Sequence, residues 1–267
     1  MLKLDKYTVS VENKVVLDNI SLDFALGKNY CILGKNGSWK SSLAMSIMGH
    51  PKYENMAGEI VLSDDASFIN ADTLECLKHK EIEDLNHIDI IQLDVTLRAK
   101  LGIFVAFQSI PEIVGVKLFE FLRTIYNAKR SSNETFLSFK KIVEPLCEEL
   151  SIPRDFLWRD VNVGFSGWER RKIEILQLKL LKPRYVFLDE VDSGLDVDAF
   201  RSVAKLLADY NAHDNCLIII THYFEILEWI PVDHVYMLSD GRLVEQWDMA
   251  LIKRVKEHGF DDGVDKL

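Results

Sequence analysis

A glycine-rich loop between an apolar run and a helical pattern is the feature that most constrains this fold. Residues 34–42 read Gly-Lys-Asn-Gly-Ser-Trp-Lys-Ser-Ser, directly after the apolar run at 30–33. This stretch differs at one position from the pattern G-x-x-x-x-G-K-[ST]. In that pattern, backbone N–H groups and a helix N-terminus hold phosphate. A strand, such a loop and a helix, in that order, predict an α/β sheet with a phosphate site at its edge.

The mismatch in this loop is Trp39, which stands where the pattern has its second glycine. A glycine is needed there because a side chain would crowd the phosphate and oppose the backbone geometry. A non-glycine residue pays roughly 1–2 kcal/mol for left-handed backbone alone, before any steric clash with the ligand. The sequence as printed therefore predicts poor phosphate binding at an otherwise intact loop.

Length and composition describe an ordinary globular protein. The chain has 267 residues, 48% of them hydrophobic, and a net charge of −10. No apolar run approaches the roughly 18 residues of a membrane helix, and residues 1–6 lack the apolar stretch of a signal peptide. The acidic balance argues against nucleic acid as the main partner. We expect a cytoplasmic protein with no nucleic-acid partner, no direct membrane insertion and reduced cysteines, of which Cys31 and Cys216 lie in the core.

Hydrophobic periodicity predicts strands that alternate with helices in one folding unit. The unbroken apolar runs 185–188 and 217–220 are typical of strands buried inside a parallel sheet. Residues 63–100 are polar with weak periodicity, and we expect a partly helical surface insertion there. The other expected strands are 2–9, 14–25, 30–33, 58–62, 102–106, 235–238 and 242–245, and the expected helices are 40–49, 116–129, 134–150 and 168–181.

Polar residues follow three of the expected strands. Asp189 and Glu190 come after 185–188, where Asp189 could hold Mg²⁺ and Glu190 could polarise an attacking water. A helix cap is an equally good explanation for acids at a strand end. His222 follows 217–220 as a candidate γ-phosphate sensor, although a lone histidine is usually only a hydrogen-bonded polar group. Gln108 follows 102–106 and is the weakest of these signals by itself.

Residues 162–169 read Asn-Val-Gly-Phe-Ser-Gly-Trp-Glu, and here the chain resembles the ATP-binding-cassette (ABC) ATPases. Their signature loop is Ser-Gly-Gly followed by Gln or Glu, and the order of the other motifs is also theirs. The resemblance implies a P-loop NTPase of the ABC type, an α/β fold with a mixed central sheet, a β subdomain and a helical subdomain. It implies one domain over 1–267, a helical subdomain at about 109–165 and a surface insertion at about 63–95.

Within that superfamily the chain is most similar to the SufC family, the ATPases of the Suf iron–sulfur cluster assembly system. The stretches that carry this are 102–108, 161–167, 188–196 and 221–223, with Asn162-to-Gly167 and Asp192-Ser193-Gly194 as the discriminating pieces. The resemblance implies SufB-like and SufD-like scaffold partners, docked near 110–150, and a transient ATP-dependent self-dimer. The cluster itself would lie on the partners.

The resemblance also assigns roles to individual residues. Catalysis would involve Glu190 as the base, His222 at the γ-phosphate and Gln108 as a sensor of metal and water. Mg²⁺ would be held by Ser41, Gln108 and Asp189. Tyr7 could stack on adenine, although core packing is the better explanation, and Asp196 would link the two sites of a dimer. ATP would contact Gly34, Lys35, Asn36, Gly37, Ser38, Trp39, Lys40, Ser41 and Ser42, with Ser166 and Gly167 completing the site of an opposing subunit.

Trp168 replaces the second glycine of the signature, and Trp247 also falls where the family usually has glycine. Decay to a pseudo-ATPase, deliberate mutation and misdecoded codons are the competing explanations. Some bacteria read the UGA codon as glycine, and only 13 of the 267 residues are glycine, about 5% against the roughly 7% of average proteins. We favour the hypothesis that Trp39, Trp168 and Trp247 are glycines in the cell. An ABC transporter ATPase subunit, and a non-hydrolysing regulatory subunit if the tryptophans are genuine, remain the alternatives.

Overall fold

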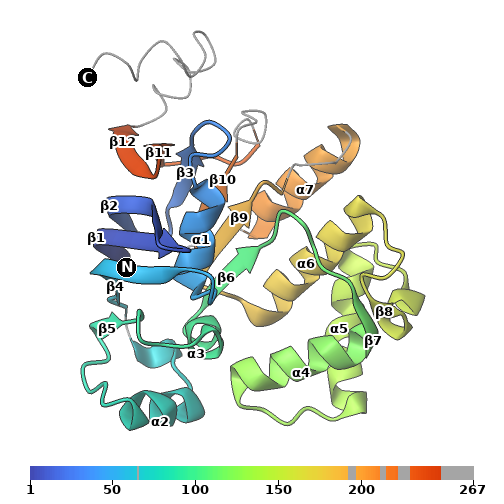
Figure 1. The fold of residues 1–267 in the computed structure, drawn as a ribbon. Helices are drawn as coiled ribbons and strands as arrows, with labels where there is room; N and C mark the ends of the chain where they lie inside the picture. The colour runs from blue at the N-terminus through green and yellow to red at the C-terminus, as the bar shows by residue number, and fades with distance from the viewer. Residues whose placement is uncertain (65, 192–196, 211–214, 222–228, 248–267) are drawn as a thin grey trace.

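A mixed six-stranded sheet forms the centre of the fold (Figure 1). The computed structural model describes residues 1–64, 66–191, 197–210, 215–221 and 229–247. The strands of this sheet are β3 (Asn29–Leu33), β6 (Ile103–Ala106), β9 (Tyr185–Asp189), β10 (Cys216–Ile220), β11 (His234–Ser239) and β12 (Arg242–Trp247). They lie in the order β12-β11-β3-β10-β9-β6, and only the β11–β12 pair is antiparallel. The predicted α/β fold with a mixed central sheet is confirmed.

Two hydrophobic clusters cover the opposite faces of this sheet, because successive side chains of a strand point to opposite sides. On β3, Cys31 and Leu33 pack in the cluster that includes helix α6 (Gly167–Leu181). Tyr30 and Ile32 pack in the other cluster, with helix α1 (Lys40–Met48). Cys31 and Cys216 are completely buried, as predicted.

A second, antiparallel sheet packs on the α1 side of the central sheet. It consists of β1 (Leu2–Val11), β2 (Lys14–Phe24), β4 (Glu54–Leu62) and β5 (Ile88–Asp89), in the order β2-β1-β4-β5. Its apolar residues share one cluster with Leu43, Ala44 and Ile47 of α1. Helix α1, which follows the glycine-rich loop, therefore packs between the two sheets.

A mainly helical part lies on the other side of the molecule, to the right of the central sheet in Figure 1. It contains β7 (Ile113–Lys117), α4 (Leu118–Arg130), α5 (Phe136–Glu149), a 3-10 helix (Arg154–Trp158) and β8 (Asp160–Val161). Thr135 caps α5 by accepting from the backbone N–H of Ser138. Helix α6 packs on α4, α5 and α7 (Val197–Tyr210). Helix α7 and the short β7–β8 pairing were not among the predicted elements. None of the helices that the structure describes is both long and apolar enough to cross a membrane.

The segment 63–100 is partly helical, as predicted, but one charged side chain of its last helix is buried. It contains a 3-10 helix (Ala66–Phe68), α2 (Ala71–His79) and α3 (Val95–Lys100). Arg98 of α3 is only 5% exposed. Its guanidinium donates to the carbonyl oxygens of Ser46 (3.1 Å), Ile47 (2.8 Å), Ile91 (2.7 Å) and Leu93 (2.9 Å). The expectation of a surface segment is wrong for Arg98. The last carbonyl oxygens of a helix have no partner within the helix, and Arg98 donates to those of Ser46 and Ile47 in α1.

We expect Arg98→Met to lower the free energy of unfolding by about 2–4 kcal/mol, because it leaves buried carbonyl oxygens without a donor. Urea denaturation followed by far-UV circular dichroism measures this change. Lys100→Met, on the same helix and partly exposed, is the control and should change stability by less than about 0.5 kcal/mol. Equal losses in both variants would contradict a capping role for Arg98.

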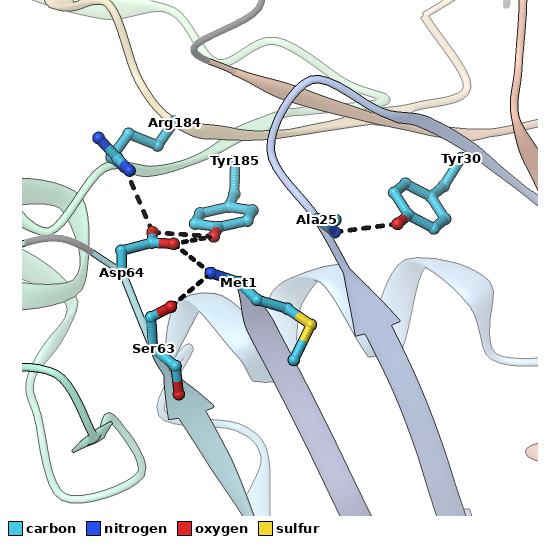
Figure 2. Close-up of polar contacts among 7 residues, drawn as sticks. All are labelled: Met1, Ala25, Tyr30, Ser63, Asp64, Arg184 and Tyr185. Carbon is cyan, nitrogen blue, oxygen red and sulfur yellow. Dashed lines mark hydrogen bonds and ion pairs between the residues drawn. The ribbon is translucent and has the colours of Figure 1, made fainter.

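A buried carboxylate joins the start of this segment to both sheets (Figure 2). Tyr185, the first residue of β9, donates its hydroxyl to both oxygens of Asp64, at 3.0 and 2.9 Å. Asp64 also accepts from Arg184 Nε at 3.3 Å and from the amino group of Met1. Burial and the neighbouring Asp64 carboxylate raise the pKa of Tyr185 well above its ordinary value. The hydroxyl therefore stays a donor at every working pH, and the network fixes residue 64 to the central sheet.

Candidate phosphate and metal site

The glycine-rich loop connects β3 to α1 and closes over the head of Lys40. A Cβ atom on Gly34 would lie 2.3 Å from the Leu238 carbonyl oxygen and 2.5 Å from Ser38 Oγ, so only glycine fits there. Lys40 is buried, and its Nζ donates to the carbonyl oxygens of Gly34 (2.7 Å) and Lys35 (3.0 Å). Burial lowers the pKa of Lys40, and the nearby Glu190 and Asp189 oppose that change. Of the other predicted contacts, Ser38 and Ser42 are buried, whereas Lys35, Asn36 and Gly37 are exposed.

Trp39 stands at the start of α1 with φ 70° and ψ 24°, in the left-handed region. Bulky residues rarely adopt this conformation, whereas glycine does so without cost. The indole is half-buried beside the β1–β2 sheet, and Lys14 Nζ lies 5.6 Å from its ring centroid. The backbone at this position therefore has the geometry that the glycine of the pattern would supply.

Ser41 and Asp189 meet at the carboxyl edge of the central sheet. Ser41 is in the first turn of α1 and Asp189 ends β9, and Ser41 Oγ donates to Asp189 Oδ1 at 2.9 Å. Burial raises the pKa of Asp189 to about 6, with the Ser41 hydrogen bond opposing this shift and Glu190 adding to it. A hydroxyl and a carboxylate are the hard oxygen ligands that Mg²⁺ takes in phosphate sites. These two side chains fit that ion.

Glu190 and Gln108 are brought together from different strands. Gln108 follows β6, and its Nε2 donates to Glu190 Oε2. Glu190 is 9% exposed, with φ 46°, and its N–H donates to the Ile220 carbonyl oxygen at 2.9 Å. Among the described residues neither acid caps a helix, because Asp189 ends β9 and Glu190 lies in a bend before a turn at Val191. A carboxylate held by an amide beside the Ser41–Asp189 pair is a suitable general base for water.

Ser166 and Gly167 lie at the N-terminus of α6, where both are exposed. Ser166 accepts from the Glu169 N–H at 3.3 Å, and Glu169 Oε2 accepts from the Ser166 N–H at 2.7 Å, which forms a capping box. Trp168 is half-buried against the helical cluster, and Lys172 Nζ lies 5.0 Å from its ring centroid. This helix end is polar and exposed, it lies on an element separate from the phosphate loop, and its capping box binds the N–H groups of Ser166 and Glu169.

Several predicted positions fall outside the described residues, namely His222, Asp196 and 192–194. Trp247 is the last residue of β12. Tyr7 is 3% exposed in the core of the antiparallel sheet, which confirms core packing and excludes it as an adenine platform. Within the part of the chain that the structure describes, no three His, Cys, Asp or Glu side chains gather at a metal-binding point.

Sequence reasoning missed a buried ion pair beside the site. Arg171 and Glu174 of α6 are joined by an Nη1–Oε2 contact of 2.6 Å, and their side chains are 5% and 8% exposed. The available signal was an opposite-charge pair three residues apart inside an apolar stretch of helix, since Ile173, Ile175 and Leu176 surround it. A buried charge in such a stretch needs partners. These are backbone groups of Phe107 and Gln108, the two residues after β6 that we call the Gln108 loop.

An apolar cavity of about 490 Å³ lies between α1 and α3 on one side and α4 on the other. Its lining includes Phe107, Ile110 and Pro111, which follow β6, with Phe121 and Ile125 of α4. Phe107 is 40% exposed, so the residue before Gln108 forms part of this open surface. A surface of this composition is suited to contact with another polypeptide.

Comparison with known proteins gives a consistent result. A model of the family described as "ABC transporter" matches residues 17–193. A "Probable ATP-dependent transporter ycf16" of Cyanidium caldarium is 36% identical over 264 residues, covering 97% of this chain and 95% of that protein. A "Probable ABC transporter ATP-binding protein" of Streptococcus pyogenes serotype M18 is 35% identical over 263 residues, covering 97% and 93%.

Solved structures share the fold at low sequence identity. A dimeric post-hydrolysis state of the ATP-binding cassette MJ0796, bound to ADP and Pi, has a TM-score of 0.72 at 16% identity and covers 93% of this chain and 99% of that one. A nucleotide-free cassette from an ABC transporter has a TM-score of 0.71 at 17% identity, covering 100% and 97%.

Proposed function

This chain belongs to the ABC transporter family and carries its ATP-binding domain, and from that premise we propose that it hydrolyses ATP with Mg²⁺. The observation that carries the proposal is the Ser41–Asp189 hydrogen bond of 2.9 Å beside the Lys40 head and the Gln108–Glu190 contact. Lys40 binds the β- and γ-phosphates, Ser41 and Asp189 hold Mg²⁺ with Gln108, and Glu190 accepts a proton from the attacking water. His222 contacts the γ-phosphate.

The whole of residues 1–267 forms one such domain in this proposal, with a helical subdomain at about 109–165 and an insertion at about 63–95. The active form is a dimer that encloses two ATP molecules. Ser166 and Gly167 are exposed at a helix N-terminus, so they are free to face the nucleotide on a second copy. The dimeric post-hydrolysis cassette with ADP and Pi supports this arrangement.

We further propose that this ATPase serves Suf-type iron–sulfur cluster assembly in the cytoplasm. The support is in the sequence, in the stretch from Asn162 to Gly167, Asp192-Ser193-Gly194 and Thr221-His222-Tyr223. SufB-like and SufD-like scaffolds would dock at the apolar cavity that Phe107 lines. A scaffold that moves Phe107 would also move Gln108, the next residue in the chain. ATP-driven closure of the dimer would then rearrange the scaffolds.

A transporter ATPase is the second candidate, because the similar curated proteins carry transporter names. Affinity purification of the chain from its own cells distinguishes the two. Recovery of a SufB-like scaffold that lacks membrane spans supports the cluster-assembly role, whereas recovery of a permease with several membrane spans rejects it. Phe107→Asp, placed in the exposed cavity wall, should abolish either capture, and Leu137→Asp, exposed on α5 outside the cavity lining, should leave it intact.

A further inference from the structure

We propose that Arg171 and Glu174 are positioning residues that hold the Gln108 loop and thereby set the Gln108–Glu190 contact. The inference rests on the proposed ATPase function and adds a link from the signature helix α6 to the site of the same subunit. The two residues form hydrogen bonds with the backbone of residues 107 and 108, and through this backbone they act on Gln108.

The ion pair brackets one residue of the loop on both sides. The N–H of Phe107 donates to Glu174 Oε1 at 3.1 Å, and the carbonyl oxygen of Phe107 accepts from Arg171 Nη1 at 2.8 Å. Arg171 Nη2 also reaches the carbonyl oxygen of Gln108, at 3.3 Å. Arg171 of α6 therefore holds the carbonyl oxygens of the peptide planes on both sides of Gln108, and the direction of the Gln108 side chain depends on these planes.

The chemistry of the pair fits positioning better than stability. Burying two charges is expensive, and a buried ion pair is commonly no more stabilising than apolar residues of similar volume. Burial raises the pKa of Glu174, and the adjacent Arg171 opposes that shift. The planar fork of Arg171 spans two successive carbonyl oxygens, which a single lysine ammonium on a flexible stem would not fix.

The Arg171–Glu174 pair with its bonds to residues 107 and 108 forms a clamp on the Gln108 loop. Helix α6 connects this clamp to the exposed Ser166 and Gly167. Arg171 is five residues beyond Ser166 on α6, roughly 7.5 Å along the helix axis. Because a helix moves as a rigid element, a displacement at Ser166 carries Arg171, Phe107 and Gln108 with it. Contact of the signature loop with a second copy would in this way alter the Gln108–Glu190 geometry on its own subunit.

Hydrogen exchange tests the clamp without any need for turnover. The Arg171→Lys and Glu174→Gln variants are made in the chain with Trp39 and Trp168 unchanged. In each, the amide hydrogen of Phe107 should exchange at least about 10-fold faster, because its hydrogen bond to Glu174 Oε1 is weakened. Lys179→Met, also on α6, breaks the ion pair between Lys179 and Glu149 of α5, and it should leave this amide unchanged. Unchanged exchange at Phe107 in both clamp variants, or an equal rise in the Lys179 control, would overturn the inference.

Kinetics then separates positioning from mere stability, in the Trp39→Gly, Trp168→Gly background. Arg171→Met should lower kcat by about 10- to 100-fold with KM for ATP changed less than about twofold. Arg171→Lys should recover part of the loss. Combined with Gln108→Ala, Arg171→Met should add nothing further, because both remove the same contact. If the loss of kcat in the double variant equals the product of the two single losses, the positioning role is refuted. If the background itself hydrolyses no ATP, the proposed function fails, while the exchange measurement still decides the clamp.

Discussion

Replacing Trp39 and Trp168 together by glycine is expected to raise ATP turnover from below detection to a measurable, partner-stimulated rate. Trp39 holds a left-handed backbone at φ 70° on the loop that must approach phosphate, and Trp168 follows the exposed Ser166 and Gly167. The other described site residues are held by hydrogen bonds, Lys40 with Gly34, Asp189 with Ser41 and Glu190 with Gln108. Removing the two indoles should therefore restore access to the proposed ATP site.

The two glycines should act at different steps. Trp39→Gly alone should recover ATP binding, since it relieves about 1–2 kcal/mol of backbone strain and clears the phosphate loop. Trp168→Gly alone should leave binding weak, because the indole at position 39 still blocks the loop. Both should be needed for turnover, since each site of the proposed dimer would use the loop of one copy and the signature of the other. Fluorescent-nucleotide titration and a phosphate-release assay measure the two steps separately.

Trp229→Gly is the matched control, because Trp229 is 45% exposed and belongs to neither loop. It should restore neither binding nor turnover. Equal turnover in the printed chain and the double variant would refute the steric argument and favour genuine tryptophans. The codons give an independent check, since UGA at 39, 168 and 247 agrees with glycine in the cell and UGG at 39 and 168 rejects it.

Local patterns predicted the parts of this fold that depend on short stretches of sequence. The apolar runs at 30–33, 185–188 and 217–220 became neighbouring parallel strands, and the motif at 34–42 placed α1 from Lys40. The polar residues at strand ends then met because parallel strands share a carboxyl edge. This geometry brought Ser41 to Asp189, 148 positions apart in the sequence.

The contacts that sequence reasoning missed are those with no local signature. Arg98 was read as part of a polar surface segment, yet it caps α1 from 52 residues away. Arg171 contacts Phe107, 64 positions away in the sequence. The residues around Arg171 predict only an ordinary helix. In both cases a charged side chain is buried because distant backbone carbonyls need donors, and that need is visible only once the elements are packed.

Asp189→Asn is expected to abolish Mg²⁺-dependent turnover while making the protein more stable at pH 7.5. Its carboxyl has a pKa of about 6 in the fold, against an ordinary value of 3.8. The folded state therefore binds more protons than the unfolded chain between these values, and stability falls as the pH rises through this window. Above pH 6 the charged Asp189 costs about 3 kcal/mol at most. Asparagine removes that cost and can still accept the Ser41 hydrogen bond.

The gain in stability should itself depend on pH, which gives the test its direction. Asp189→Asn should raise the free energy of unfolding by about 1–3 kcal/mol at pH 7.5 and lose that advantage as the pH falls through about 6 toward 3.8. Asp160→Asn is the control of opposite sign, because its hydrogen bond from Lys117 lowers the Asp160 pKa, so that variant should gain no stability at pH 7.5. Urea denaturation at several pH values measures both. A gain for Asp189→Asn that stays constant down to pH 4 would contradict the assignment. The opposed changes in stability and turnover are those expected of an acid kept charged and buried for metal binding.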